Sequence, residues 1–347
     1  MLDPRTPFMT ALLKSQRPRL VNRERLERLQ GLGDVSEAVE QLQDTDAGAW
    51  LEGQGWRNAE ERDHALWRYL SELLGKIELR RFFPPDARRL SRAWVLKFDL
   101  ANLKAALQGL VENEAPRLLP IGVLHAKGRL DALAGARDRD EIEDLLTRSG
   151  LSEFARLTRG FDPAASRRAR REVELALEAA YHHALRRTVR PLGGGHILGS
   201  ACGVMIDFAN LGILCRRLAK AASGTGTAAG ELFIAGGRLL DSRALGDALA
   251  HGLDELPRRL EHDIHRRVAT DVASAWERTG LLGVIDTEIE KHRLAVLHEL
   301  LAPQVAPAVV MAWFLVVKEI ELRNLRLALA AVEDGHGLDA VRRQLLL

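Results

Sequence analysis

The sequence predicts an all-α protein built from three pseudo-symmetric helical repeats. Leu, Ala, Arg and Glu dominate its 347 residues, and aromatic residues make up only 5%, a composition that favours helices over strands. No stretch sustains the apolar–polar alternation of a β-strand. A short polar motif occurs three times, at a spacing that divides the chain into near-equal thirds, which indicates an internal repeat.

Each copy of the motif has an acidic residue, then Asn three positions later, then Leu. The copies are Asp99, Asn102 and Leu103; Asp207, Asn210 and Leu211; and Glu321, Asn324 and Leu325. The residues four before and four after each Asn are apolar, so on a helix each Asn lies inside an apolar stripe. A buried amide needs hydrogen-bond partners. We interpret the motif as a structural clasp; the alternative is a ligand or catalytic site, which rarely recurs unchanged in every repeat.

Helical periodicity and breaking residues suggest the same order of elements in each third. Residues 1–118 contain short helices, a long helix over 60–80 and a return helix over 87–110 that carries Asn102. Residues 119–232 repeat this plan, with a long helix that begins at Pro163 and a return helix that carries Asn210. Residues 233–347 end in a third long pair, 285–301 and 307–333, and residues 337–342 resemble the start of a fourth unit.

Charge and cysteine content narrow the functional classes. The chain has 50 basic and 48 acidic residues, interspersed, so it lacks the basic surplus of a nucleic-acid-binding protein. Cys202 and Cys215 lie in an apolar segment and are expected in the core of a protein from a reducing compartment. The first residues lack a signal peptide, and the longest apolar run, 306–317, is shorter than the roughly 20 residues of a membrane span.

The sequence contains no recognisable motif for catalysis, metals or cofactors, so we expect no cofactor, no metal site and no enzyme. The Gly-rich stretch 224–230 lacks the Lys-Ser/Thr ending of a phosphate loop and is expected to be a flexible connection. His262 and His265 have no Cys or acidic partner at metal-ligand spacing and are expected to be solvated. The densest basic cluster is Arg167, Arg168, Arg170 and Arg171, which could dock an acidic partner or form an ordinary solvated face.

Three stretches resemble a known family. Residues 318–326 are similar to the C-terminal motif of the C subunit of archaeal and bacterial V/A-type rotary ATPases, the family of the d subunit in eukaryotic vacuolar ATPases. Residues 98–104 and 206–211 resemble its first and second repeat motifs. The resemblance implies a non-catalytic central-stalk subunit: a funnel-like socket of three lobes on the cytoplasmic face of the membrane, which joins the shaft to the proteolipid ring.

In that family the subunit transmits torque for ATP-coupled transport of protons or sodium ions, and the resemblance does not distinguish the two ions or the direction of ATP turnover. Two other hypotheses stay open. One is an unrelated all-α repeat scaffold for protein–protein interaction. The other is an enzyme that uses the repeated acids, which requires turnover that disappears in Asp99→Asn or Asp207→Asn while the fold stays intact.

Overall fold

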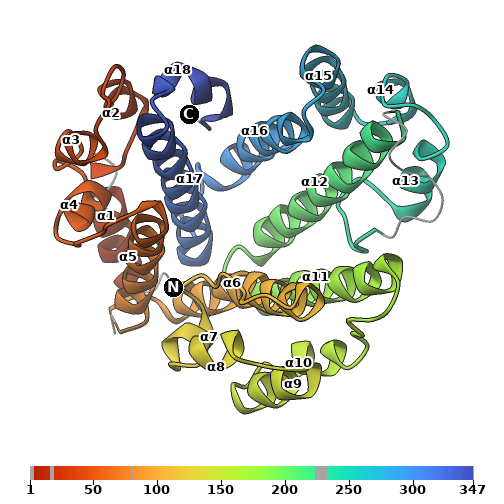
Figure 1. Cartoon of the computed structure of the whole chain (residues 1–347), viewed down its shortest axis with the longest axis horizontal. Coiled ribbons are helices and arrows are strands. Elements are labelled where there is room, and N and C mark those ends of the chain that lie inside the picture. Colours follow the sequence, from red (N-terminus) through yellow and green to blue (C-terminus); the bar gives the residue numbers. More distant parts are fainter. Residues whose placement is uncertain (1–3, 16–18, 80–81, 223–232, 347) are drawn as a thin grey trace. The chain divides into compact units, whose positions relative to one another are not determined.

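The computed structural model describes residues 4–15, 19–79, 82–222 and 233–346 (Figure 1). Within these ranges all regular secondary structure is helical, which confirms the all-α prediction. The Gly-rich stretch 224–230 lies outside the described residues. The chain forms two compact units: unit 1 comprises Met1–Ala164 and Gln304–Leu347, and unit 2 comprises Ala165–Pro303. The division into three repeats stays a prediction.

The described residues of unit 1 form several short helices and three long ones. Its short helices are α1 (Arg5–Ser15), α2 (Arg23–Glu27), α3 (Val35–Glu40), α4 (Asp46–Glu52), α7 (Val123–Ala126), α8 (Leu130–Ala134), α9 (Arg139–Arg148), α10 (Ser152–Thr158) and α18 (Gly337–Val341). The long helices are α5 (Ala59–Leu79), α6 (Pro85–Glu112) and α17 (Pro307–Glu333). A 3₁₀ turn, Arg342–Gln344, follows α18.

Local chemistry explains where many of these helices begin and end. The side chains of Asn22, Asp34 and Thr45 cap α2, α3 and α4 by accepting a backbone N–H from the first turn. Pro85 begins α6, where a missing N–H costs nothing. Asn113, with φ 55°, ends the same helix in the left-handed conformation.

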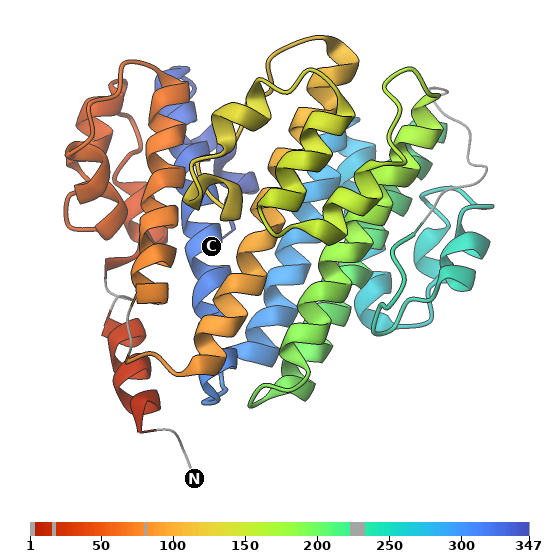
Figure 2. The same ribbon diagram turned by 90° about the horizontal axis from the view of Figure 1, so that it is seen from below.

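Helix α17 is the centre of unit 1. It packs along α6 and also contacts α1, α3, α5 and α18 (Figure 2). Most of its side chains are buried, and two ion pairs join it to α5. Arg62 donates to Glu333 at 2.8 Å, and Arg326 donates to Asp63 at 2.5 Å. Polar links therefore fix the register of α5 against α17 in addition to apolar burial.

Unit 2 is built around α12 (Gly195–Ala222), which packs against α16 (Leu282–Leu301), α11 (Arg167–Val189) and α15 (Asp263–Thr279). Its described residues also form two short helices, α13 (Ser242–Ala248) and α14 (Leu256–Arg259). By length and composition alone α12 could cross a membrane, but 72% of its most apolar window is buried, as in a core helix. Both cysteines are free and buried in α12, as predicted.

The predicted long helices are all present, with small differences at their ends. Helix α11 begins at Arg167 and not at Pro163, because Ser166 accepts the N–H of Ala169 and caps the helix there. Helices α16 and α17 match the predicted stretches 285–301 and 307–333, but they belong to different units. Their pairing with each other stays a prediction.

Candidate functional site: three acid–asparagine clasps

The three motif copies lie on the long helices α6, α12 and α17. All three Asn side chains and the three acids are at most 3% exposed. This confirms the burial predicted for the Asn side chains. Each Asn binds both an N–H and a C=O of backbone outside its own helix, so that its amide is paired. The acids bind further backbone N–H groups. We call the copies clasp 1, clasp 2 and clasp 3 in chain order.

Clasp 1 holds the segment 119–124, which leads into α7. Asn102 accepts the N–H of Leu119 at 2.7 Å and donates to the carbonyl oxygens of Leu119 and Ile121 at 3.0 and 3.3 Å. The two oxygens of Asp99 accept the N–H groups of Val123 and Leu124, both at 2.8 Å. Both donors are at the start of α7, where unpaired N–H groups need acceptors.

Burial raises the pKa of Asp99 to about 6, although the two N–H bonds and the positive charge of Lys127 oppose that shift. The segment passes very close to this carboxyl group at Gly122, whose φ is +110°. A Cβ at this position would lie 2.6 Å from Oδ1 of Asp99. Glycine therefore serves both the backbone conformation and the close approach.

Clasp 2 holds the segment 234–240 by the same chemistry. Asn210 exchanges two hydrogen bonds with Ile234, at 2.8 and 2.9 Å. Asp207 accepts three N–H groups, from Arg238, Leu239 and Leu240, at 2.9 to 3.1 Å. Burial raises the pKa of Asp207, and the bonds from these amides act against the shift.

His265 lies beside clasp 2 and is buried, so the expectation of a solvated side chain is wrong for this residue. It shares the buried side of α15 with Val268, Ala269 and Val272, at helical spacing. Its Nε2 is 4.0 Å from Oδ2 of Asp207, and its buried Nδ1 has no hydrogen-bond partner among the described residues. Burial lowers the pKa of His265 to about 4, so the imidazole is neutral at pH 7.

Clasp 3 differs from the other two in its partners. Asn324 exchanges two hydrogen bonds with Leu346, at 2.7 and 2.9 Å. Glu321 accepts the N–H of Val21 at 2.8 Å on one oxygen and Lys318 Nζ at 2.8 Å on the other. Lys318 also donates to the hydroxyl of Tyr69 at 2.9 Å.

An ammonium group therefore takes the place that a second backbone amide has in clasps 1 and 2. Lys318 is fully buried. Burial lowers its pKa, but the charge of Glu321 and the hydrogen bonds to Glu321 and Tyr69 raise it by more, and the net shift is upward. Burial also raises the pKa of Tyr69 to about 12. The group is a buried ion pair whose charges are compensated, an arrangement that is costly to break from one side.

The sequence reasoning found the acids and amides but missed Lys318, Tyr69, His265 and the glycines. The available signals were a Lys one helical turn before Glu321 and a Gly at a similar point of the first two segments, Gly122 and Gly237. A Cβ on Gly237 would lie 2.1 Å from Oδ1 of Asp207. The roles of these residues can be recognised only when the groups that they contact are known.

The predicted basic cluster occupies the first turns of α11. Arg168 and Arg171 pair with Glu172 and Glu174 of their own helix, at 3.4 and 2.9 Å. Arg170 donates to the carbonyl oxygen of Ala165 at 2.7 Å, and Arg167 is exposed. These bonds run within the start of α11 and not to the motif residues of α12. The docking role of the cluster stays a prediction.

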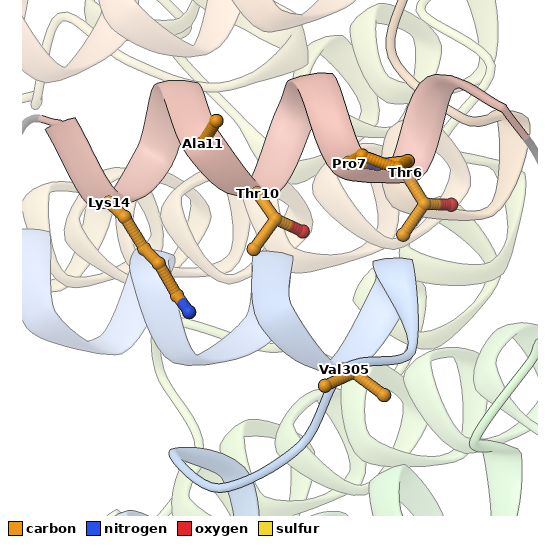
Figure 3. A pocket seen from close by; sticks show the side chains of 6 residues that line it. All are labelled: Thr6, Pro7, Thr10, Ala11, Lys14 and Val305. Atoms are coloured by element: carbon orange, nitrogen blue, oxygen red, sulfur yellow. The ribbon is translucent and has the colours of Figure 1, made fainter.

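Unit 1 also has an open hollow of about 400 Å³ beside α1. Its lining residues are Thr6, Pro7, Thr10, Ala11, Lys14 and Val305. Figure 3 shows Thr10 and Lys14 pointing from α1 toward the segment of Val305. The walls are almost entirely apolar, and among the described residues that line the hollow Lys14 is the only charged one. Among the residues that the structure describes, no group of three or more His, Cys, Asp or Glu side chains could hold a metal ion.

The fold and the clasps define an all-helical protein whose repeated polar motif binds its own backbone. Comparison with known proteins shows the family to which this chain belongs. Residues 9–344 match the family described as ATP synthase (C/AC39) subunit. The chain is 25% identical to the C subunit of the A-type ATP synthase of Methanocaldococcus jannaschii over 331 residues, covering 92% of this chain and 80% of the relative. It is also 25% identical to the same subunit of Pyrococcus abyssi, covering 95% of this chain and 88% of that protein. The chain belongs to the family of V/A-type ATP synthase C (AC39) subunits.

The first prediction concerns the amide of clasp 1. Asn102→Leu removes the side-chain partners of the Leu119 N–H and of the carbonyl oxygens of Leu119 and Ile121. We expect the free energy of unfolding to fall by about 1–3 kcal/mol, measured by denaturant melts. The control is Gln108→Leu, at an exposed position of the same helix. An Asn102→Leu melt that coincides with the wild-type curve would show that this amide does not stabilise the fold.

The second prediction concerns the close approach in clasp 2. Gly237→Ala brings a methyl group into Asp207 and the carbonyl oxygen of Leu240, and we expect a loss of about 1–3 kcal/mol in a thermal melt. Gly199→Ala, in α12, meets nothing within 4 Å and should be neutral or slightly stabilising. Equal melting temperatures for the two variants would contradict the contact.

The third prediction concerns pH. The pKa of His265 is about 4 in the folded protein and 6.5 as an ordinary histidine. Its contribution to stability is therefore complete above pH 6.5 and is lost as the pH falls toward 4. We expect about 3 kcal/mol of pH-dependent stability over this range to disappear in His265→Phe, followed by urea melts at several pH values. His183→Gln, at an exposed histidine of α11, should keep the wild-type pH dependence.

Proposed function

We propose that this chain is the non-catalytic central-stalk subunit that links the shaft of a V/A-type rotary ATPase to the membrane proteolipid ring. In this role it transmits torque for ATP-coupled transport of protons or sodium ions. It would lie in the cytoplasm, attached to the membrane through the ring and without a bilayer span of its own. Its proposed form is a funnel-like socket of three repeats, 1–118, 119–232 and 233–347.

The observation that carries this proposal is the family match over residues 9–344. Two relatives, each named as the C subunit of an A-type ATP synthase, align with nearly the whole chain. The relatives cover both units, so the proposal concerns the entire chain and not one part of it.

The clasps support a mechanical role in preference to a chemical one. Asp99 and Asp207 would be the candidate reacting groups of an enzyme, but their carboxylate oxygens accept backbone N–H bonds from the following segments. Such satisfied polar groups in a low-dielectric interior hold one backbone arrangement. Such rigidity suits a subunit that passes torque between two partners, because a segment that yields would let one partner turn without turning the other.

The fourth prediction tests the partners. Affinity-tagged full-length chain, expressed in its source cells and purified from mild-detergent membranes, should capture both the shaft subunits and the proteolipid, identified by mass spectrometry. Replacing Arg167, Arg168, Arg170 and Arg171 by Gln should weaken that capture if the cluster docks an acidic partner. The matched control replaces Arg258, Arg259, Arg266 and Arg267, which are exposed residues of unit 2.

Membranes from cells that lack this chain supply the functional arm of the experiment. Their ATPase heads should still hydrolyse ATP but should not drive ion transport, and purified chain should restore the coupling. A tagged chain that captures neither shaft nor proteolipid, together with normal transport in its absence, would overturn the proposal. Capture of other proteins only would instead favour a general interaction scaffold.

A further inference from the structure

Clasp 3 holds two pieces of backbone that are far apart in the sequence. In clasps 1 and 2 the Asn and the acid bind successive parts of one short segment. In clasp 1, Asn102 binds the backbone of residues 119 and 121, and Asp99 binds that of residues 123 and 124. In clasp 2, Asn210 binds residue 234 and Asp207 binds residues 238–240. In clasp 3 the Asn binds Leu346, but the acid binds Val21, 300 residues before it.

The acid-bound part nevertheless has the same place relative to the helices that follow it. In each of the first two clasps the Asn-bound part comes first in the sequence and the acid-bound part second. The acid-bound part then leads into a series of shorter helices and a long helix: α7–α10 then α11, and α13–α15 then α16. Val21 leads into the short helices α2, α3 and α4, followed by the long helix α5. Val21 therefore occupies the acid-bound position, and Leu346 the Asn-bound position, of a single split segment.

Further contacts join the two pieces. Gln30 lies just beyond α2 and donates to Asp339 of α18 at 3.2 Å, and Arg342 donates back to Gln30 at 3.3 Å. Arg323, adjacent to Asn324, donates to the carbonyl oxygen of Gln344 at 2.7 Å. Val21 and Leu346 are both buried. The two pieces are thus held on one turn of α17 and bonded to each other, although no short peptide connects them.

We propose that residues 19–30 and 339–346 form a split clasp on α17, and that the second of these pieces is a latch that anchors the segment leading into α2. Clasps 1 and 2 each hold a continuous segment, so the loss of one bond leaves the segment tethered by the residues beside it. In the split clasp that tether is absent. Release of Leu346 leaves Val21 with one hydrogen bond to Glu321, so residues 21–27 should open before the segments held by clasps 1 and 2.

This inference rests on the contacts of unit 1 and not on the proposed rotor role. It also concerns assembly, because the segment at Val21 is synthesised long before Glu321 and Asn324, its anchor on α17. The segment at Val21 is then fixed on α17 only after that helix has docked.

The fifth prediction is measured by amide hydrogen exchange. In a chain shortened to end at Gln344, Asn324 loses both of its Leu346 bonds, and we expect exchange over residues 21–27 to accelerate about tenfold. Exchange over 119–124 and 234–240, held by clasps 1 and 2, should be unchanged. Asn324→Ala should give the same pattern, whereas its matched control Asn210→Ala should accelerate 234–240 and leave 21–27 alone.

The full-length protein provides a test that does not depend on how the variants fold. In native-state exchange at increasing denaturant, the amides of Val21 and Leu346 should open with the same free energy and the same denaturant dependence. Different openings for these two amides, or unchanged exchange over 21–27 in the shortened chain, would overturn the split clasp. Either result would leave the proposed rotor role untouched, since that role is tested by capture and transport.

Discussion

The structure depends on one constraint: an amide or carboxyl group placed in an apolar helix stripe must find partners, because burying it unpaired costs several kcal/mol. The partners here are backbone groups outside the helix. Each long helix that carries the motif thereby fixes a segment of chain that has no regular structure of its own, such as 119–122 or 234–240. The same bonds that satisfy the side chains also satisfy the segment's N–H and C=O groups. Removing either side leaves the other unpaired.

The clasps use different means to stabilise a buried acid. Asp99 accepts two backbone N–H bonds, Asp207 accepts three, and Glu321 accepts one together with the ammonium of Lys318. The more hydrogen bonds a buried carboxylate accepts from backbone N–H groups, the less it needs a positively charged partner. In clasp 3 the acid-bound segment supplies one N–H, from Val21, and the buried ammonium group of Lys318 binds the other carboxylate oxygen.

These features bear on the function in a specific way. Membership of the family of ATP synthase C subunits makes a role between shaft and membrane ring the natural proposal. Torque loads every connection between elements, and non-regular segments are the places where a helical protein yields most easily. A motif that ties those segments to the longest helices of both units would raise the stiffness there. On this view the repeated motif stabilises the interior of the protein, and other residues form the surfaces that contact partners.

The sequence by itself determined the all-helical class, the long helices and the three acid–asparagine positions, because helical periodicity and a repeated motif are local properties of the chain. It also predicted that the three Asn side chains are buried. The identity of their partners was decided by tertiary structure: Asn102 binds a segment 17–19 residues away, whereas Glu321 binds one 300 residues away. Local patterns contain no information on such separations. His265 is a different case, because it lies at helical spacing with Val268, Ala269 and Val272 on the buried side of α15. This local pattern was available in the sequence and indicates burial.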